Sequence, residues 1–221
     1  MSGAAKRIGS VSGKTAAPLL DLRFARLLGP DDWARLPPAI RRRFSKHITP
    51  DCEVHYDGLI EHTTLNLAGR ALAQLLRLIG APLPLDADNH GQRACVSINE
   101  ARDGSGQRWT RRYDRTRARR PQTITSTKSF AGRTGCAEWV TPWLGMELGL
   151  RAEEDALYFE SRTYCLKILG RRVVLPRGLS PGTIRVGHHH IRASEFRFTL
   201  TLTHPLFGRL VDQAILFRDG D

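Results

Sequence analysis

Alternation of apolar and polar residues is the dominant pattern in the second half of the chain. Between residues 195 and 203 every second residue is apolar, from Phe196 to Leu202, with charged residues and threonines between them. Side chains two positions apart lie on the same face of a strand, so this segment is predicted to be a strand with one face on a core. Residues 144–150 alternate in the same way and are also predicted to form a half-buried strand.

Further segments have the composition of strands. Residues 94–100 and 107–113 flank Asp103-Gly104-Ser105-Gly106, and glycines there tolerate the positive φ of a tight turn, which predicts a hairpin. Aromatic and β-branched residues predict additional strands at residues 53–60, 123–130, 137–140, 157–169, 183–191 and 210–217.

A period of three to four residues identifies the helices. Leu65, Ala68, Leu72, Leu76 and Ile79 recur at helical spacing, which predicts an amphipathic helix over residues 66–79. Shorter helices are expected at residues 32–36 and 39–46, near Pro37 and Pro38. Residues 170–182, rich in Pro and Gly, are expected to form a loop.

Successive strands without alternating helices predict a mainly β (α+β) fold rather than a parallel sheet. We expect a strongly curved antiparallel sheet or half-open barrel, with short N-terminal helices and one amphipathic helix packed on it. Residues 1–18, rich in small residues, are expected to form a flexible tail, and residues 19–221 a single domain.

Composition narrows the possible classes. No segment approaches the ~18 apolar residues of a membrane span, and the N-terminus lacks the apolar core of a secretory signal, so a soluble, cytoplasmic protein is expected. The four cysteines are far apart, which disfavours zinc and disulfide frameworks. A net charge of +12 indicates a basic protein, but most of its cations are arginines, a bias that a GC-rich genome also produces.

The order of these segments resembles a bacterial family, the domain of unknown function 4166. The resemblance is carried by LLGPDDWARLPPAIRR, HYDGLIEHTTLNLAGRALAQLLRLIGAPLP, QRWTRRYD, WLGMELGLRAEEDALYFESRTYCLKILGRRVVLPRGLSPG and FRFTLTLTHPLFGRLVDQAILFRDG. Because such domains occur alone or behind a nicotinamide-dependent dehydrogenase-like domain, the resemblance implies an oxidoreductase partner. GRTGCAEW and GRRVVLPRG are not dinucleotide-binding motifs, so no cofactor is predicted.

Two histidines are candidates for a site inside the sheet. His188 and His190 share a strand face with Ile184 and Val186, so their side chains could point toward the interior of the sheet. The pair could contribute to a metal site only with a third ligand such as Glu138, Glu160 or His204, and no metal motif supports one. Hydrogen-bonded or partly exposed histidines are therefore favoured over metal ligands.

Carboxylates supply the other polar candidates. Glu160 and Arg162 share a predicted strand face with Tyr158 and Tyr164, where they could line a cavity, although a cross-strand ion pair is the favoured interpretation. Glu138, in GCAEWV, is a further candidate for the site, although an ion pair is again the favoured interpretation.

A third group alternates aromatic and basic residues. Trp109 and Arg111 precede the arginines at positions 115, 117, 119 and 120. Such a pattern can stack bases and grip phosphates, or meet an anionic membrane surface, but a solvated basic loop is favoured and nucleic-acid binding is disfavoured.

Taken with the apolar strand faces, these residues favour a non-enzymatic module that binds a hydrophobic or lipid-like small molecule. The predicted ligand-binding residues are Trp109, Arg111, Glu138, Glu160, Tyr164, His188 and His190. An accessory domain or subunit of an NAD(P)-dependent oxidoreductase, and a nucleic-acid-binding protein, remain as alternatives. Whether the chain catalyses a reaction stays open.

Overall fold

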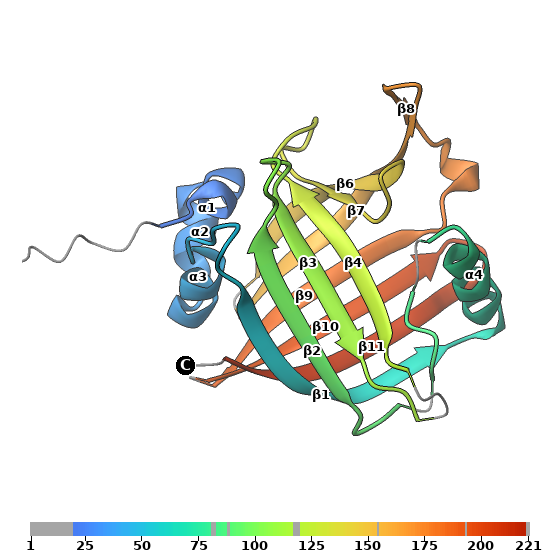
Figure 1. Ribbon diagram of the computed structural model, residues 1–221, viewed down its shortest axis with the longest axis horizontal. Helices are drawn as coiled ribbons and strands as arrows, with labels where there is room; N and C mark the ends of the chain where they lie inside the picture. The colour runs from blue at the N-terminus through green and yellow to red at the C-terminus, as the bar shows by residue number, and fades with distance from the viewer. Residues whose placement is uncertain are drawn as a thin grey trace, which may run out of the picture.

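A computed structural model describes residues 20–80, 83–87, 89–116, 120–153, 155–192 and 194–219. Within these residues, ten antiparallel strands form a closed barrel in the order β6-β5-β4-β3-β2-β1-β11-β10-β9-β7, and β7 pairs again with β6 (Figure 1). The prediction of a mainly β, antiparallel fold is confirmed. The half-open sheet is corrected to a closed barrel, because the pairing of β6 with β7 joins the two ends of the sheet.

The barrel strands are β1 (Val54–Leu65), β2 (Arg93–Glu100), β3 (Gln107–Tyr113), β4 (Gln122–Ser129), β5 (Ala137–Trp139), β6 (Leu144–Glu153), β7 (Ala156–Ile168), β9 (Thr183–Arg192), β10 (Glu195–His204) and β11 (Gly208–Asp219). The predicted hairpin is present as β2 and β3. The expected loop at residues 170–182 instead contains a short strand, β8 (Arg171–Val174), paired with β7, and the 3₁₀ helix η1 (Arg177–Leu179).

Strand alternation places apolar side chains inside the barrel. On β10, Phe196, Phe198 and Leu202 are buried, as their spacing predicts. On β7 a bulge interrupts the alternation, because Ser161 lies opposite Leu148 whereas Tyr164 lies opposite Met146. Since a bulge adds one residue to one strand, Tyr164 points inward and does not share the face of Glu160, which corrects the predicted grouping.

Three short helices cover one end of the barrel. They are α1 (Arg23–Leu28), α2 (Pro30–Arg35) and α3 (Pro38–Phe44). The helix expected at residues 32–36 begins two residues earlier because proline suits the first turn, where no N–H donor is needed. Phe24, Ile40 and Phe44 are buried against the barrel interior, so the helices fill this end.

The predicted amphipathic helix, α4 (Leu67–Leu78), lies across the other end of the barrel (Figure 1). Asn66 caps it, because its side-chain oxygen accepts a hydrogen bond from the backbone N–H of Gly69 at 2.7 Å. A Cβ atom on Gly69 would lie 2.0 Å from the Leu210 carbonyl oxygen. Glycine at this position therefore lets the helix approach β11 closely.

Closure is incomplete on one side of the barrel. The short strand β5 pairs with residues 127–129 of β4, so the edge of residues 122–126 has no second strand beside it in the described part of the chain. This free edge lies toward the α4 end. No helix among the described residues is long and apolar enough to cross a membrane.

Candidate ligand-binding site

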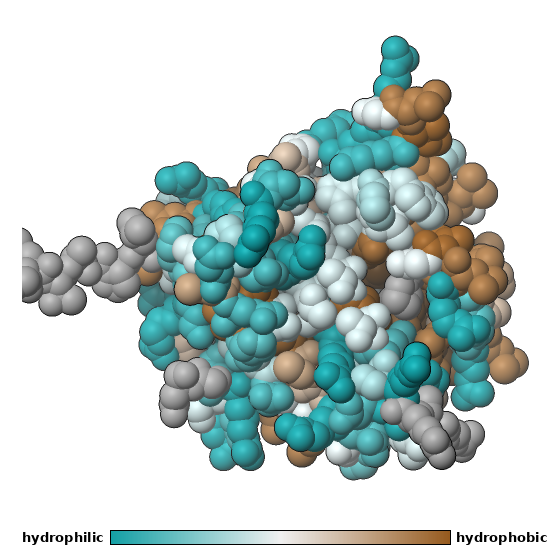
Figure 2. Space-filling view, viewed as in Figure 1, coloured by the Kyte–Doolittle hydropathy of each residue, from teal (hydrophilic) through white to brown (hydrophobic). Residues whose placement is uncertain are grey.

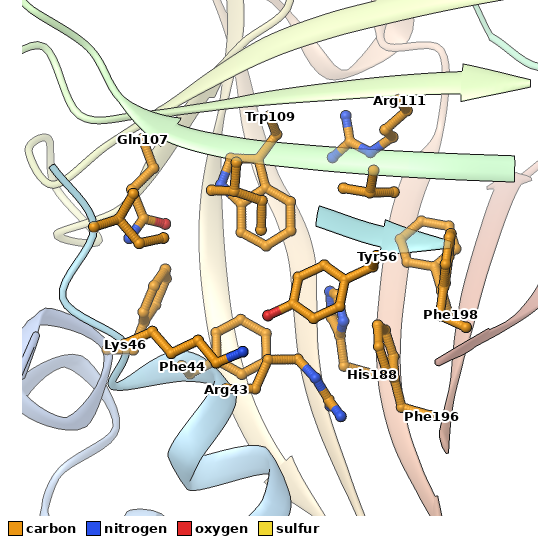
Figure 3. A pocket seen from close by; sticks show the side chains of 15 residues that line it. Arg43, Phe44, Lys46, Tyr56, Gln107, Trp109, Arg111, His188, Phe196 and Phe198 are labelled. Atoms are coloured by element: carbon orange, nitrogen blue, oxygen red, sulfur yellow. The ribbon is translucent and has the colours of Figure 1, made fainter. Parts of the chain in front are cut away.

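The end of the barrel below α1 to α3 is filled by side chains. Trp109 on β3, His188 on β9 and Phe196 and Phe198 on β10 converge there with Phe44 of α3 (Figure 3). The space left between them is about 30 Å³, close to the volume of one water molecule. This end is a packed core with no room for an organic ligand.

His188 lies in the middle of this packed end. Its ring is within 6.2 Å of the rings of Phe44, Phe159, Phe196 and Phe198, measured between centroids. Burial, reinforced by three nearby cations, holds the pKa of His188 well below its usual value. His188 is therefore a neutral member of the core at physiological pH.

A buried ionic cluster lies on the adjoining wall, formed by β3, β4 and β5. Lys128 Nζ lies 2.7 Å from one carboxylate oxygen of Glu138, and Arg111 Nη2 lies 3.3 Å from the other. Ser126 donates a hydrogen bond to that second oxygen at 2.5 Å. All four side chains are buried, so one carboxylate faces two cations inside the barrel.

Electrostatics in this cluster determine the protonation of Glu138. Burial alone would raise the pKa of Glu138, but Lys128 and Arg111 outweigh it and hold the pKa at about 2. Burial is also the main cause of the lowered pKa of Lys128. A carboxylate with a pKa this low is a weak base near neutral pH, so the cluster resembles a structural ion network more than a general acid–base pair.

The α4 end of the barrel is hollow. A cavity of about 470 Å³ lies between the helix and the ends of β6, β7, β9, β10 and β11. The side chains that line it are predominantly apolar and include Leu72, Leu76, Leu83, Val140, Leu144, Met146, Tyr164, Ile184, Leu202 and Leu210. Its volume falls within the usual range for small-molecule sites, about 300–1,000 Å³.

The cavity carries few polar groups. Tyr164 is one of the polar residues in the lining. Burial raises the pKa of Tyr164 to about 12, so its hydroxyl stays protonated near neutral pH. Met146 lies opposite Glu138 in the pairing of β5 with β6, which places the ionic cluster one strand away from the cavity wall. The site is thus an apolar chamber beside a buried charged network.

A second, polar hollow opens on the barrel side, along the free edge of β4. It is lined by threonines and serines of β4 and by Arg77, Lys167 and Arg172. Val140 lines both this hollow and the apolar cavity. Figure 2 shows apolar atoms at the bottom of an opening beside α4 on this face.

The structure separates the residues predicted for the site. Trp109, Arg111 and His188 border the packed end, and Tyr164 alone lines the large cavity. His190 shares the inward face of β9 with His188, because it pairs with Phe196. Glu138 belongs to the ionic cluster described above.

Glu160 lies apart from these groups, on the outer face of β7. Its carboxylate is 3.4 Å from both Arg162 and Arg185, so it forms surface ion pairs. In the described residues, no three His, Cys, Asp or Glu side chains are grouped closely enough to hold a metal ion.

The aromatic and basic alternation at the start of the arginine-rich loop faces the barrel interior. Trp109 and Arg111 are both buried, so neither presents a surface on which a nucleic-acid base could stack. Arg115 forms an ion pair with Asp86 at 2.8 Å. Arg120 is exposed, whereas Arg117 and Arg119, which belong to the same prediction, lie outside the described residues.

Most of the residues that line the cavity were not identified from the sequence. The signal was present in the helical spacing of Ala68, Leu72 and Leu76 and in the inward parity of Met146 and Leu202. Those patterns predict burial, but they do not distinguish side chains that touch each other from side chains that face an empty space.

Fold and site define this molecule as a closed antiparallel β-barrel with one packed end and one apolar chamber. The model of the family described as domain of unknown function (DUF4166) matches residues 36–215, and the chain belongs to that family. The resemblance noted from the sequence is therefore confirmed. No curated protein and no solved structure matches the chain.

Proposed function

We propose that this protein binds a hydrophobic, lipid-like small molecule in the apolar cavity beneath α4. The observation that carries the proposal is the cavity of about 470 Å³ with its predominantly aliphatic lining. Burying apolar surface of a ligand there contributes roughly 25 cal/mol per Å² before the costs of association. Barrels with one open end commonly hold such ligands in their mouths.

The lining of the site supports a predominantly apolar ligand with a small polar group. Leu202 and Leu210 form the deep wall, whereas Leu75 and Ile79 stand near the surface. Tyr164, Ser180 and His204 supply hydrogen-bonding groups within a predominantly apolar lining. A ligand of this kind would bury its apolar body and keep few polar atoms unpaired.

The proposal is tested by filling the cavity. Ala68 lines it from α4, so Ala68→Phe places a ring in the space that a ligand would occupy. We expect wild-type protein to bind the fluorescent probe N-phenylnaphthylamine saturably, and the variant to bind it about tenfold more weakly or worse. Tenfold corresponds to ~1.4 kcal/mol, less than the burial of one large side chain provides.

Ala71→Phe is the matched control, because Ala71 is an exposed position of the same helix. It should leave probe binding unchanged, and circular dichroism should show both variants folded. Equal probe binding by wild type and Ala68→Phe would contradict the proposal. Native mass spectrometry of freshly purified wild-type protein would reveal a retained small molecule directly.

A further inference from the structure

The cavity opens onto a surface that is unusually apolar. Most of the exposed large apolar side chains among the described residues lie around this end of the barrel. Examples are Leu67 (85% exposed) of α4, Leu169 (98%) between β7 and β8, and Leu206 (83%) between β10 and β11. Figure 2 shows apolar atoms gathered along the side that carries β8, η1 and α4. We call this surface the rim.

The rim segments lie around one mouth. Residues of α4, of the turn that contains Trp143, of η1 and of the β10–β11 turn all line the same cavity. Monomeric proteins seldom leave a continuous apolar area of this kind exposed unless it meets another surface. The rim is therefore expected to be covered in the cell.

The charge of the rim indicates what covers it. The rim contains no Asp or Glu. It is formed by residues 67–79, 141–145, 166–182 and 204–209. They do contain basic residues, among them Arg70, Arg77, Lys167, Arg171 and Arg209. Among the described residues, Arg77 and Arg171 have no ion-pair partner.

We propose that the rim docks on the surface of an anionic lipid bilayer. Exposed leucines and aromatic residues enter the boundary between headgroups and acyl chains, and the surrounding arginines and lysines meet anionic headgroups. A second copy of the chain fits poorly, because it would bring two sets of cations together with no acidic residue between them. Docking faces the cavity mouth toward the bilayer, which gives a lipid-like ligand a route that avoids water.

The docking proposal goes beyond ligand binding, and the side chains substituted in its test do not line the cavity. Its test is sedimentation of the protein with vesicles of phosphatidylcholine and phosphatidylglycerol, compared with vesicles of phosphatidylcholine alone. We expect binding to the anionic vesicles that weakens as salt is added. The double variant Arg77→Glu with Arg171→Glu should bind at least about tenfold more weakly.

The matched control reverses the same amount of charge elsewhere. Arg112→Glu with Arg151→Glu changes two exposed arginines on the outer barrel wall and should bind vesicles almost as well as wild type. Leu169→Ser with Leu206→Ser removes the apolar part of the rim and should also weaken binding. Leu59→Ser, exposed on β1, is its control.

Three results would overturn the proposal. One is failure of wild-type protein to sediment with anionic vesicles at low salt. A second is equal weakening by the rim variants and their controls, which would indicate attraction by net charge alone. The third is a dimer in analytical ultracentrifugation that the leucine variant dissolves, which would assign the rim to a second copy. Ala68→Phe distinguishes the two proposals, because this variant should no longer bind the fluorescent probe but should still sediment with anionic vesicles.

Discussion

Individual side chains inside the barrel owe their chemistry to their neighbours. Glu138 sits between Lys128 and Arg111, where its charge neutralises one of two buried cations. Burying a carboxylate without such partners would be very costly, so the three side chains depend on one another. The result is a rigid wall between β3 and β5 rather than a reactive group.

Glu138→Gln should destabilise the protein strongly. The variant leaves Lys128 and Arg111 buried with no negative charge, and losing one partner of a buried ion pair typically costs about 3–5 kcal/mol. Glu160→Gln, which removes ion pairs with the partly exposed Arg162 and Arg185, should cost less than about 1 kcal/mol. Urea denaturation of both variants measures the difference, and similar losses would contradict a buried network.

His188 makes stability depend on pH. The pKa of His188 in the folded protein is lowered from 6.5, so below about pH 6.5 the unfolded chain takes up a proton that the folded protein excludes. Stability is therefore lost as the pH falls through this range, by up to ~1.4 kcal/mol per pH unit.

His188→Phe should reduce that dependence. A phenyl ring suits the surrounding aromatic side chains and does not titrate. Thermal midpoints of wild type should fall from pH 7 to pH 5 by more than those of the variant. Parallel curves for the two proteins would show that His188 contributes nothing to the acid sensitivity.

At the scale of elements, the contact between α4 and β11 determines whether the cavity has a roof. Helix propensity by itself favours alanine over glycine by about 1 kcal/mol, so a substitution at Gly69 would stabilise an isolated helix. In the protein the added Cβ would meet the Leu210 carbonyl oxygen at 2.0 Å. The backbone contact outweighs the propensity.

Gly69→Ala should therefore lower the thermal midpoint and weaken probe binding, because α4 must move away from β11. Gly178→Ala serves as the control, since its added Cβ meets no atom within 4 Å. It should change stability by less than about 0.5 kcal/mol. A stabilised Gly69→Ala variant with unchanged probe binding would contradict this prediction, because it would show that α4 accommodates the added Cβ without loss of stability.

At the scale of the whole molecule, ten strands close the barrel, but part of β4 has a neighbouring strand on one side only. The strand β2 is paired on both sides, whereas residues 122–126 of β4 are paired only with β3. That free edge borders the polar hollow which shares Val140 with the apolar cavity. The side of the barrel is thus its least protected part.

Amide hydrogen exchange should reveal this edge. Alternate amides of residues 122–126 lack a strand partner and should exchange faster than the amides of β2. The measurement is exchange followed by NMR or by mass spectrometry of peptides. Equal protection of β2 and of residues 122–126 would show that the edge is covered in solution.

Much of this architecture could be predicted from local patterns. Period two in residues 195–203 and helical spacing in residues 66–79 predicted β10 and α4 within one or two residues. The bulge on β7 could not be read in this way, since alternation placed Tyr164 beside Glu160. The same limit applies to the site, because Trp109 and His188, which were predicted to bind a ligand, lie in the filled end.

By itself the sequence determined the ten barrel strands, the helices α2 to α4 and the basic, acid-free segments of the rim, because each depends on neighbours a few positions away. Only the tertiary structure decided that β6 meets β7, that Glu138 lies between Lys128 and Arg111, and that one end is filled while the other is hollow. These features depend on distances between residues far apart in the chain. Periodicity shows which way a side chain points, but not what it meets.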